Sequence, residues 1–236
     1  MSKSSYCHPS VIMSSIVQPL FPVGLSLVGQ HVIVIGGRAE AVDKTRRLLA
    51  AQAKVTVDSL RVDPEILTLA ENEKVVWLRR EVKSIDMRGC QLVLNTLSPQ
   101  NPAHASIFAW ARRERVLIST YDQPDRSDLG MPAEVKRGHL RIAISTSNAS
   151  PTIAGALRRA LELIIDESEI EEFLDHLGEL RQENRPRVES TAKRRTLMQK
   201  AASGITFSGT LGLPNDWRGR IDDMRRKFGM IGSKTK

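Results

Sequence analysis

The stretch that decides the fold runs from His31 to Asp58 and reads HVIVIGGRAEAVDKTRRLLAAQAKVTVD. It opens with four β-branched residues at 32–35, a run too short for a helix and typical of a strand buried on both faces. A Gly36-Gly37 turn, an amphipathic helical pattern and a second apolar run at 55–57 follow before Asp58. A strand, a glycine turn, a helix, a strand and a terminal acid in this order predict the βαβ unit that binds dinucleotides.

The turn matches the phosphate-binding pattern G-x-G-x-x-G/A with one departure. The pattern falls on residues 36–41, GGRAEA, in which Arg38 stands where the middle glycine is expected. Amide groups at the start of the helix are suited to a pyrophosphate, and the arginine could either pair with a phosphate or obstruct it. The residues expected to contact the pyrophosphate are Gly36, Gly37, Arg38 and Ala39. Asp58 lies 22 positions past Gly36, where an acid that takes a ribose hydroxyl favours NAD over NADP.

Strand and helix patterns alternate after Asp58. Apolar runs predict strands at 75–78, 91–94 and 116–118, and helices are expected at 63–72 and 102–115. This alternation favours an α/β fold with a Rossmann-like, doubly wound parallel sheet and right-handed crossovers. Asn95 and Thr96 follow the fourth strand, at the edge where such sheets place ligand contacts, and are further candidates for cofactor binding.

The pattern changes after residue 120. A polar segment at 121–128 precedes two short strand patterns, 133–136 and 140–145, that flank Arg137-Gly138-His139 and predict a hairpin. A hydroxyl-rich loop at 145–150 leads into a helix that begins at Ser150-Pro151 and ends near residue 165. A further amphipathic helix is expected at 169–180, with Pro186 limiting its continuation. Loose structure at 203–215 and a short basic helix at 217–228 complete the chain.

The positive charge is concentrated at the end of the chain. The net charge is +8, and residues 181–236 hold 14 Lys and Arg against 5 Asp and Glu, whereas the other 180 residues are nearly neutral. Such a tail can attract nucleic acid, anionic lipid or a polyanionic small molecule, or it can simply be solvated. We therefore expect a disordered leader at 1–18, a Rossmann-like NAD-binding domain at 19–120, a hairpin and helical region at 121–180, and a partly disordered basic tail at 181–236.

Composition excludes several classes of protein. No apolar run approaches the roughly 20 residues of a membrane span, and the first 18 residues do not have the pattern of a signal peptide. The two cysteines, Cys7 and Cys90, predict neither a disulfide framework nor a cysteine metal site. We expect a cytoplasmic protein without membrane contact.

Several blocks, in order and with matching separations, resemble the precorrin-2 dehydrogenase/ferrochelatase module of siroheme synthases over about residues 19–166. The opening at 21–23 is similar to the aromatic-Pro-Ile motif of that family. The segment 34–37, together with Lys44, is similar to the family motif V-V-G-G-G-x-V-A-x-R-K. Tyr121-Asp122 and the later 131–133, MPA, resemble V-V-D…F-I-M-P-A. Residues 142–151, IAISTSNASP, resemble V-A-I-S-S-G-G-x-S/A-P, and 157–162 resembles the helix that follows.

The resemblance implies NAD-dependent oxidation of precorrin-2 to sirohydrochlorin in siroheme biosynthesis. In some members a lyase step, insertion of Fe²⁺ as a substrate, follows at the same site. Asp122 matches the essential aspartate of the family and is the expected catalytic residue, acting as a general base. The tetrapyrrole carries eight carboxylates, which hydroxyl groups can bind, and the expected substrate-binding residues are Met131, Ser145, Thr146 and Ser147. No resident metal ligand is assigned, and a homodimer that uses a helical region near 166–180 is expected.

Three departures from the family pattern keep other functions open. Arg38 replaces a glycine, residues 94–97 read LNTL where the family has A-T-D-D, and Ser147-Asn148 replaces a glycine pair. A diverged, non-catalytic relative that binds a tetrapyrrole or a partner protein is therefore the main alternative. A Rossmann-type regulator whose basic tail binds nucleic acid is a further alternative, although little aromatic interleaving supports it, and we do not expect nucleic acid as a partner.

Overall fold

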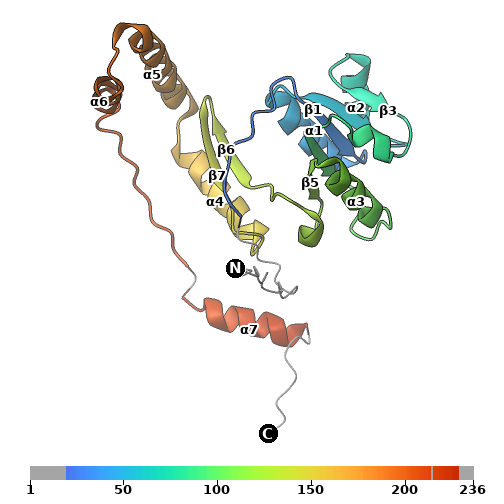
Figure 1. The fold of residues 1–236 in the computed structure, drawn as a ribbon. Helices are drawn as coiled ribbons and strands as arrows, with labels where there is room; N and C mark the ends of the chain where they lie inside the picture. The colour runs from blue at the N-terminus through green and yellow to red at the C-terminus, as the bar shows by residue number, and fades with distance from the viewer. Residues whose placement is uncertain (1–19, 214, 229–236) are drawn as a thin grey trace, which may run out of the picture. The chain divides into compact units, whose positions relative to one another are not determined.

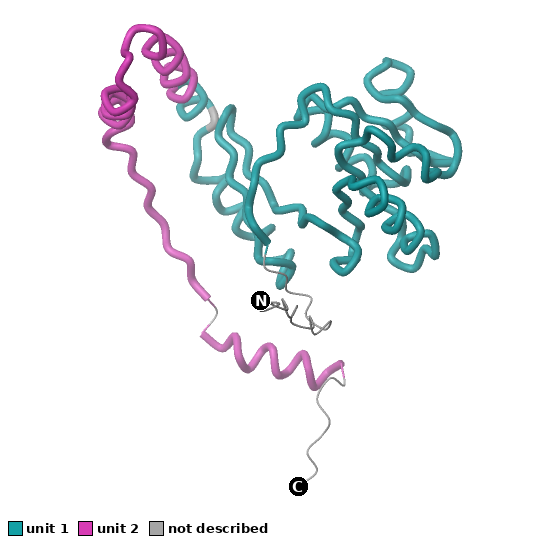
Figure 2. The backbone as a smooth tube through the Cα atoms, viewed as in Figure 1, with its two compact units in different colours: residues 1–172 teal, residues 173–236 magenta. Residues whose placement is uncertain are grey.

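The computed structural model describes residues 20–213 and 215–228. The chain divides into two compact units, residues 1–172 and 173–236 (Figure 2). The predicted leader at 1–18, which includes Cys7, lies outside the described residues.

The helices and strands of the first unit (Figure 1) are β1 (His31–Ile35), α1 (Ala39–Ala50), β2 (Lys54–Asp58), α2 (Pro64–Glu71), β3 (Val76–Leu78), η1 (Ser84–Met87), β4 (Leu92–Asn95), α3 (His104–Glu114), β5 (Leu117–Thr120), η2 (Pro124–Arg126), β6 (Ala133–Arg137), β7 (Leu140–Ile144) and α4 (Pro151–Ile164).

Five strands form one parallel sheet in the order β3-β2-β1-β4-β5. β1 pairs with β2 on one side and with β4 on the other, so that Ile35 lies beside both Asp58 and Asn95. The order reverses between β1 and β4, and parallel α/β sheets bind ligands at the carboxyl end of such a switch point. The predicted Rossmann-like doubly wound sheet is confirmed.

The core lies on both faces of this sheet. Val32 and Val34 of β1 belong to a buried cluster with α1 and α2, whereas Ile33 and Ile35 belong to a second cluster with α3. Because successive side chains of a strand point to opposite faces, the four buried positions of β1, residues 32–35, all have to be apolar. The unbroken run of β-branched residues that identified this strand in the sequence thus follows from its central place.

The hairpin and α4 form a smaller layer of the same unit. β6 and β7 are antiparallel, with Arg137 opposite Leu140 across a turn in which Gly138 has a positive φ. α4 begins as predicted, because the Ser150 side chain accepts a hydrogen bond from the backbone N–H of Ile153 and a proline follows. At the other end of the helix, the Arg137 guanidinium donates to the carbonyls of Glu162 and Ile165. Arg137 is therefore a structural residue that joins the hairpin to the helix.

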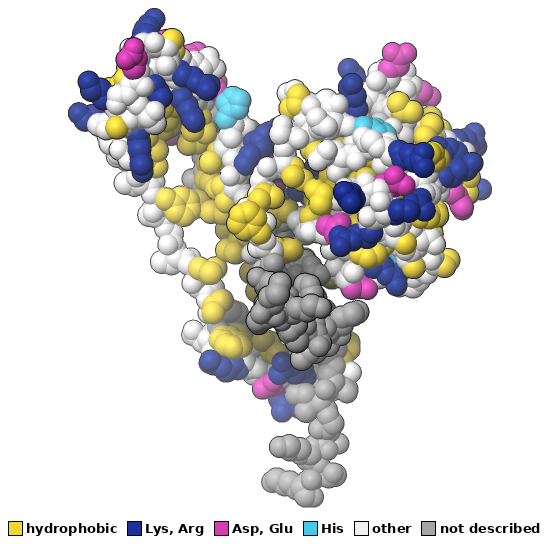
Figure 3. Space-filling view, in the orientation of Figure 1, with side chains coloured by type: hydrophobic (Ala, Val, Ile, Leu, Met, Phe, Trp, Pro, Cys, Tyr) yellow, Lys and Arg dark blue, Asp and Glu magenta, His cyan; other side chains and the backbone are white. Residues whose placement is uncertain are grey.

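Three helices follow: α5 (Glu167–Arg187), which crosses the boundary between the units, α6 (Thr191–Ala201) and α7 (Trp217–Lys227). α5 is longer than predicted but ends one residue after Pro186. The sequence did not predict α6, which has almost no amphipathic pattern and no buried residue; a Ser190 cap marks its start. Basic side chains are exposed on α6 and α7 (Figure 3).

Among the described residues, no helix combines the length and apolar character that a membrane span requires.

Candidate active site

Gly36 starts the turn at the end of β1 in a conformation that only glycine adopts readily, with a φ of 112°. A Cβ atom at this position would collide with Oγ1 of Thr96. The Thr96 hydroxyl donates to the carbonyl of Ile35 at 2.8 Å, and the backbone N–H of Gly36 donates to the carbonyl of Asp58 at 3.0 Å. These two hydrogen bonds join the end of β1 to the ends of β4 and β2.

Gly37 packs against the loop that follows β2. A Cβ atom there would collide with the carbonyl oxygen of Arg61 and lie 2.9 Å from Cα of Val62. The backbone N–H of Asp63 donates to the carbonyl of Gly37 at 2.7 Å. Gly37 thus allows the loop at 59–63 to lie directly against the turn.

Arg38 is the N-cap residue of α1, and its side chain makes no capping hydrogen bond. Arg38 and Ala39 are exposed, whereas Gly36 and Gly37 are buried. The first amides of a helix lack partners within the helix, so those of α1 can receive an anionic group. This uncapped helix start beside a tightly packed glycine turn fits the pyrophosphate of a dinucleotide.

Asn95 and Thr96 are bonded within the protein. Nδ2 of Asn95 donates to Nδ1 of His104 at 2.9 Å, and Nε2 of His104 lies 2.7 Å from the carbonyl oxygen of Ser98. Because a carbonyl only accepts, this pair of contacts assigns the proton of His104 to Nε2. Asn95 is 1% exposed, and its network orders the loop after β4. His104 is accordingly a structural residue.

Asp58 also faces the interior. Its side chain is fully buried, with Oδ1 3.4 Å from Nη1 of Arg80. Neither carboxylate oxygen has a hydrogen-bond partner among the described residues. Burial raises the pKa of Asp58 to about 6, with a further contribution from the negative charge of Asp86 and an opposing one from Arg80. Arg80 itself makes two hydrogen bonds to Asp86, at 2.7 and 2.8 Å.

Asp122 lies on an exposed loop that is firmly attached to β5. Its φ is 52°, in the left-handed region that Asp and Asn tolerate better than most residues. The backbone N–H of Thr120 donates to the hydroxyl of Ser127, and that of Ile118 to Oδ2 of Asp128. The N–H of Tyr121 donates to the carbonyl of Asn95 at 2.8 Å. Asp122 is therefore held just beyond the ends of β4 and β5, about 10 Å along the sheet from β1 at the usual strand spacing.

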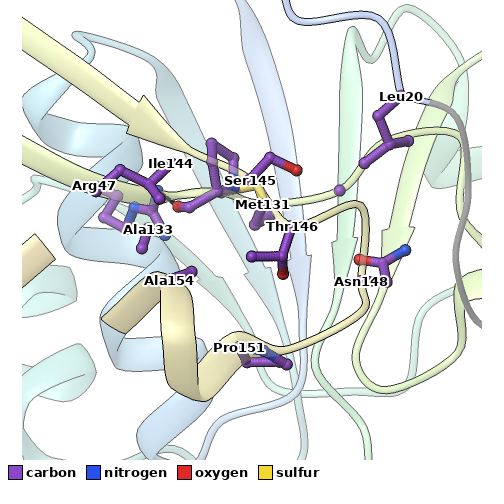
Figure 4. Close-up of a pocket in the computed structure, with 12 residues that line it drawn as sticks. Leu20, Arg47, Met131, Ala133, Ile144, Ser145, Thr146, Asn148, Pro151 and Ala154 are labelled. Carbon is purple, nitrogen blue, oxygen red and sulfur yellow. Dashed lines mark hydrogen bonds between the residues drawn. The ribbon is translucent and has the colours of Figure 1, made fainter. Parts of the chain in front are cut away.

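A pocket of about 260 Å³ lies beside the hairpin (Figure 4). Met131, Ser145 and Thr146 line it, whereas Ser147 does not. The Ser145 hydroxyl accepts from the backbone N–H of Ser147, and the Thr146 hydroxyl from that of Ser150. Neither hydroxyl donates a hydrogen bond to a described residue, so each can donate to a ligand. The remaining lining residues are Leu20, Arg47, Gly130, Pro132, Ala133, Ile144, Asn148, Pro151 and Ala154.

The structure thus divides the predicted site residues between two places. The carboxyl edge of the sheet holds the four turn residues together with Asn95, Thr96 and the Asp122 loop. Three of the four residues predicted to bind the substrate line the pocket instead. Asp122 is not among the residues that line the pocket. Within the described part of the chain, no group of three or more His, Cys, Asp or Glu side chains is placed to hold a metal ion.

Sequence reasoning missed two arginines. Arg47, on α1, reaches the pocket and donates to the carbonyl of Pro132 at 3.3 Å. Arg80 pairs with Asp58 from the loop after β3. No local sequence pattern predicts either contact, because each arginine contacts a residue that is distant in the sequence.

Comparisons with known proteins agree with this geometry. Residues 23–133 match a family described as "Putative NAD(P)-binding". The chain is 30% identical over 179 residues to siroheme synthase 3 of Aeromonas hydrophila and 28% identical over 184 residues to a siroheme synthase of Neisseria meningitidis. These alignments cover 76% and 78% of this chain but 38% of each relative, so the chain spans about two fifths of their length.

One solved structure has the same fold over nearly its whole length. SirC, a precorrin-2 dehydrogenase, superimposes with a TM-score of 0.60 at 21% identity, covering 89% of this chain and 98% of that protein. Similarity in sequence to one portion of the siroheme synthases and in fold to SirC confirms that the chain resembles the precorrin-2 dehydrogenase module of siroheme synthases.

Proposed function

We propose that the chain is an NAD-dependent dehydrogenase that oxidises precorrin-2 to sirohydrochlorin. The observation that carries the proposal is the position of Asp122, held in a left-handed conformation beyond β5, at the same carboxyl edge of the sheet as the uncapped glycine turn. Non-glycine residues with such a backbone conformation cluster at functional sites. The similarity to siroheme synthases and to a precorrin-2 dehydrogenase supports the same activity.

The protein's own part in the reaction is binding and proton removal. NAD, when bound, supplies a hydride acceptor. The turn at 36–39 would hold the pyrophosphate, which directs the nicotinamide along the sheet edge toward β4 and β5. The Asp122 carboxylate takes the proton that the substrate loses together with the hydride, so that the product gains one double bond. The attachments of the loop to Thr120 and Ile118 keep this base in place.

The pocket supports a carboxylated substrate. At about 260 Å³ it is smaller than the ligand sites of about 300–1,000 Å³ that enclose a whole small molecule. It can hold one acidic side arm of a larger ring, with Ser145 and Thr146 donating hydroxyl hydrogens and Arg47 supplying a positive charge.

The experiment that tests the proposal measures NAD binding by calorimetry and precorrin-2 oxidation by absorbance. Asp122→Asn keeps the left-handed backbone and removes the base, so we expect kcat to fall about 10²- to 10⁴-fold while NAD affinity is retained. Asp125→Asn, an exposed acid of the same loop, is the matched control and should retain activity. Wild-type protein that binds the tetrapyrrole but neither binds NAD nor oxidises precorrin-2 would instead support the non-catalytic alternative.

Insertion of Fe²⁺ into sirohydrochlorin and a homodimeric state belong to the same proposal. The α4 side chains Ile153 and Ile164 are 51% and 58% exposed and lie three helical turns apart on one face, which a second copy could cover. Iron insertion can be followed by the absorbance of siroheme, and the dimer by light scattering of wild type and Ile164→Asp. A cytoplasmic location stays a prediction.

A further inference from the structure

The residue that sequence patterns assign to the ribose is buried and lies next to an arginine. Asp58 ends β2, its side chain is fully buried, and its nearest charged partner is Arg80, with Nη1 3.4 Å from Oδ1. Arg80 is fixed in turn by two hydrogen bonds to Asp86, whose Oδ2 also accepts from the backbone N–H of Lys83. The carboxylate is thus part of a side-chain cluster between β2 and the loop after β3.

This placement removes the usual basis for rejecting a 2′-phosphate. An exposed acid at the end of the second strand binds the two ribose hydroxyls and repels the phosphate of NADP. Here the carboxylate is covered, and the adjacent guanidinium offsets its charge. The described structure therefore presents no acidic oxygen of Asp58 to a ribose.

The loop that follows offers the opposite charge. The carbonyl oxygen of Arg61 lies where a Cβ on Gly37 would be, and it accepts a hydrogen bond from the Ser59 hydroxyl at 2.7 Å. The backbone of Arg61 is therefore pinned against the glycine turn. The side chains of Arg61 and Arg38 are both exposed, on the two segments that meet there. Guanidinium groups bind phosphate oxygens through paired, charge-assisted hydrogen bonds.

We infer that Arg61 binds a 2′-phosphate on the ribose of the dinucleotide, that Asp58 does not contact this ribose, and that the site accepts a 2′-phosphate as well as a free 2′-hydroxyl. The inference rests on the proposed function, because it assumes that a dinucleotide occupies the glycine turn. It extends that function by making the enzyme able to use either nicotinamide cofactor.

The test compares the dissociation constants of NAD⁺ and NADP⁺ by calorimetry for the full chain. For wild type, the dissociation constants of NADP⁺ and NAD⁺ should differ by less than about tenfold. Arg61→Gln should raise the dissociation constant of NADP⁺ by about tenfold or more, which is the effect of losing a hydrogen-bonded charge. It should raise that of NAD⁺ by less than about threefold. Asp58→Asn should change the NAD⁺ constant by less than about threefold, because the carboxylate does not reach the ribose.

Arg88→Gln is the matched control, because Arg88 is an exposed arginine that precedes β4 and so lies at the amino edge of the sheet, away from the turn. It should leave both constants unchanged, and circular dichroism of each variant shows that it folds.

Three other outcomes would contradict either the inference or the proposed function. Suppose that wild type binds NADP⁺ more than about 100-fold more weakly than NAD⁺, and that Asp58→Asn no longer binds NAD⁺. This result would show that Asp58 turns outward to bind the ribose, and it would contradict the inference. Equal weakening of both nucleotides by Arg61→Gln would make Arg61 a pyrophosphate ligand and also contradict the inference. Wild-type protein that binds neither nucleotide would overturn the proposed function itself.

Discussion

At the carboxyl edge of the five-stranded sheet, three candidate side chains contact other groups of the protein, whereas in the pocket beside the hairpin two hydroxyl groups donate no hydrogen bond to a described residue. Asn95 donates to His104, Thr96 to the carbonyl of Ile35, and Asp58 faces Arg80. In the pocket, Ser145 and Thr146 each accept one backbone N–H, and within the described part of the chain neither hydroxyl donates a hydrogen bond.

The difference shows that the two regions recognise ligands by different means. The sheet edge offers backbone amides, a close-packed glycine turn and exposed arginines, so its affinity depends on main-chain shape and positive charge. The pocket offers side-chain hydroxyls and Arg47, so its selectivity depends on individual side chains. Substitutions in the close-packed glycine turn should therefore affect folding, whereas substitutions of the pocket hydroxyls should mainly affect ligand affinity.

The largest expected effect is that of Gly37→Ala. The new Cβ would collide with the carbonyl of Arg61 and force the turn away from the loop at 59–63. We expect a loss of about 3 kcal/mol in the free energy of unfolding together with loss of NAD binding, measured by urea denaturation and calorimetry. Gly24→Ala, where no atom lies within 4 Å of the new Cβ, is the control and should behave as wild type. An unchanged stability of Gly37→Ala would contradict the close packing of the turn.

The second effect is a pH dependence of stability due to Asp58. Its pKa is raised from 3.8 to about 6 in the folded protein, so folding favours the protonated form. The stabilisation is complete below about pH 4 and is lost as the pH rises through 6, by about 3 kcal/mol for a shift of this size. Asp58→Asn does not titrate, so the unfolding free energy of wild type minus that of the variant should fall between pH 4 and pH 7. A difference that is constant over this range would show that Asp58 is exposed to solvent.

Thr146→Val tests the pocket and should have a smaller effect on folding. The substitution removes the hydroxyl that accepts from the N–H of Ser150, which should lower the unfolding free energy by about 1 kcal/mol. The KM for precorrin-2 should rise about tenfold with little change in kcat, because the lost hydrogen bond is made in both the ground and transition states. Steady-state kinetics separate the two constants, and a fall in kcat alone would place Thr146 in the chemical step.

The smallest effect is expected for Gly155→Ala in α4, beside the pocket. The new Cβ would meet only Nη1 of Arg159, at 3.6 Å, in ordinary contact. Replacing a helical glycine by alanine should raise the unfolding free energy by about 0.5–1 kcal/mol, as measured by thermal denaturation. Destabilisation would show that this helix, unlike the turn at Gly37, depends on glycine for a reason other than space.

Much of the fold was predictable from local patterns. The strand runs, the glycine turn and the hairpin lie within a few residues of their expected bounds, and Asp63-Pro64 and Ser150-Pro151 start helices as predicted. α6 was missed because its stability does not depend on a buried apolar face. The pocket was predictable in part, since the resemblance pointed to Met131, Ser145 and Thr146, but not to Arg47.

The sequence by itself determined the strands along the chain, the glycine turn and the helix starts at Asp63 and Ser150, because periodicity, capping and backbone conformation depend on neighbouring residues. Only the tertiary structure decided what each polar side chain contacts. Asp58 and Arg80 are 22 positions apart, and Arg47 and Pro132 are 85 apart. Burial and ion pairing arise from contacts between segments distant in the chain, so the same aspartate that predicts a ribose ligand in the sequence lies in the interior of the folded protein.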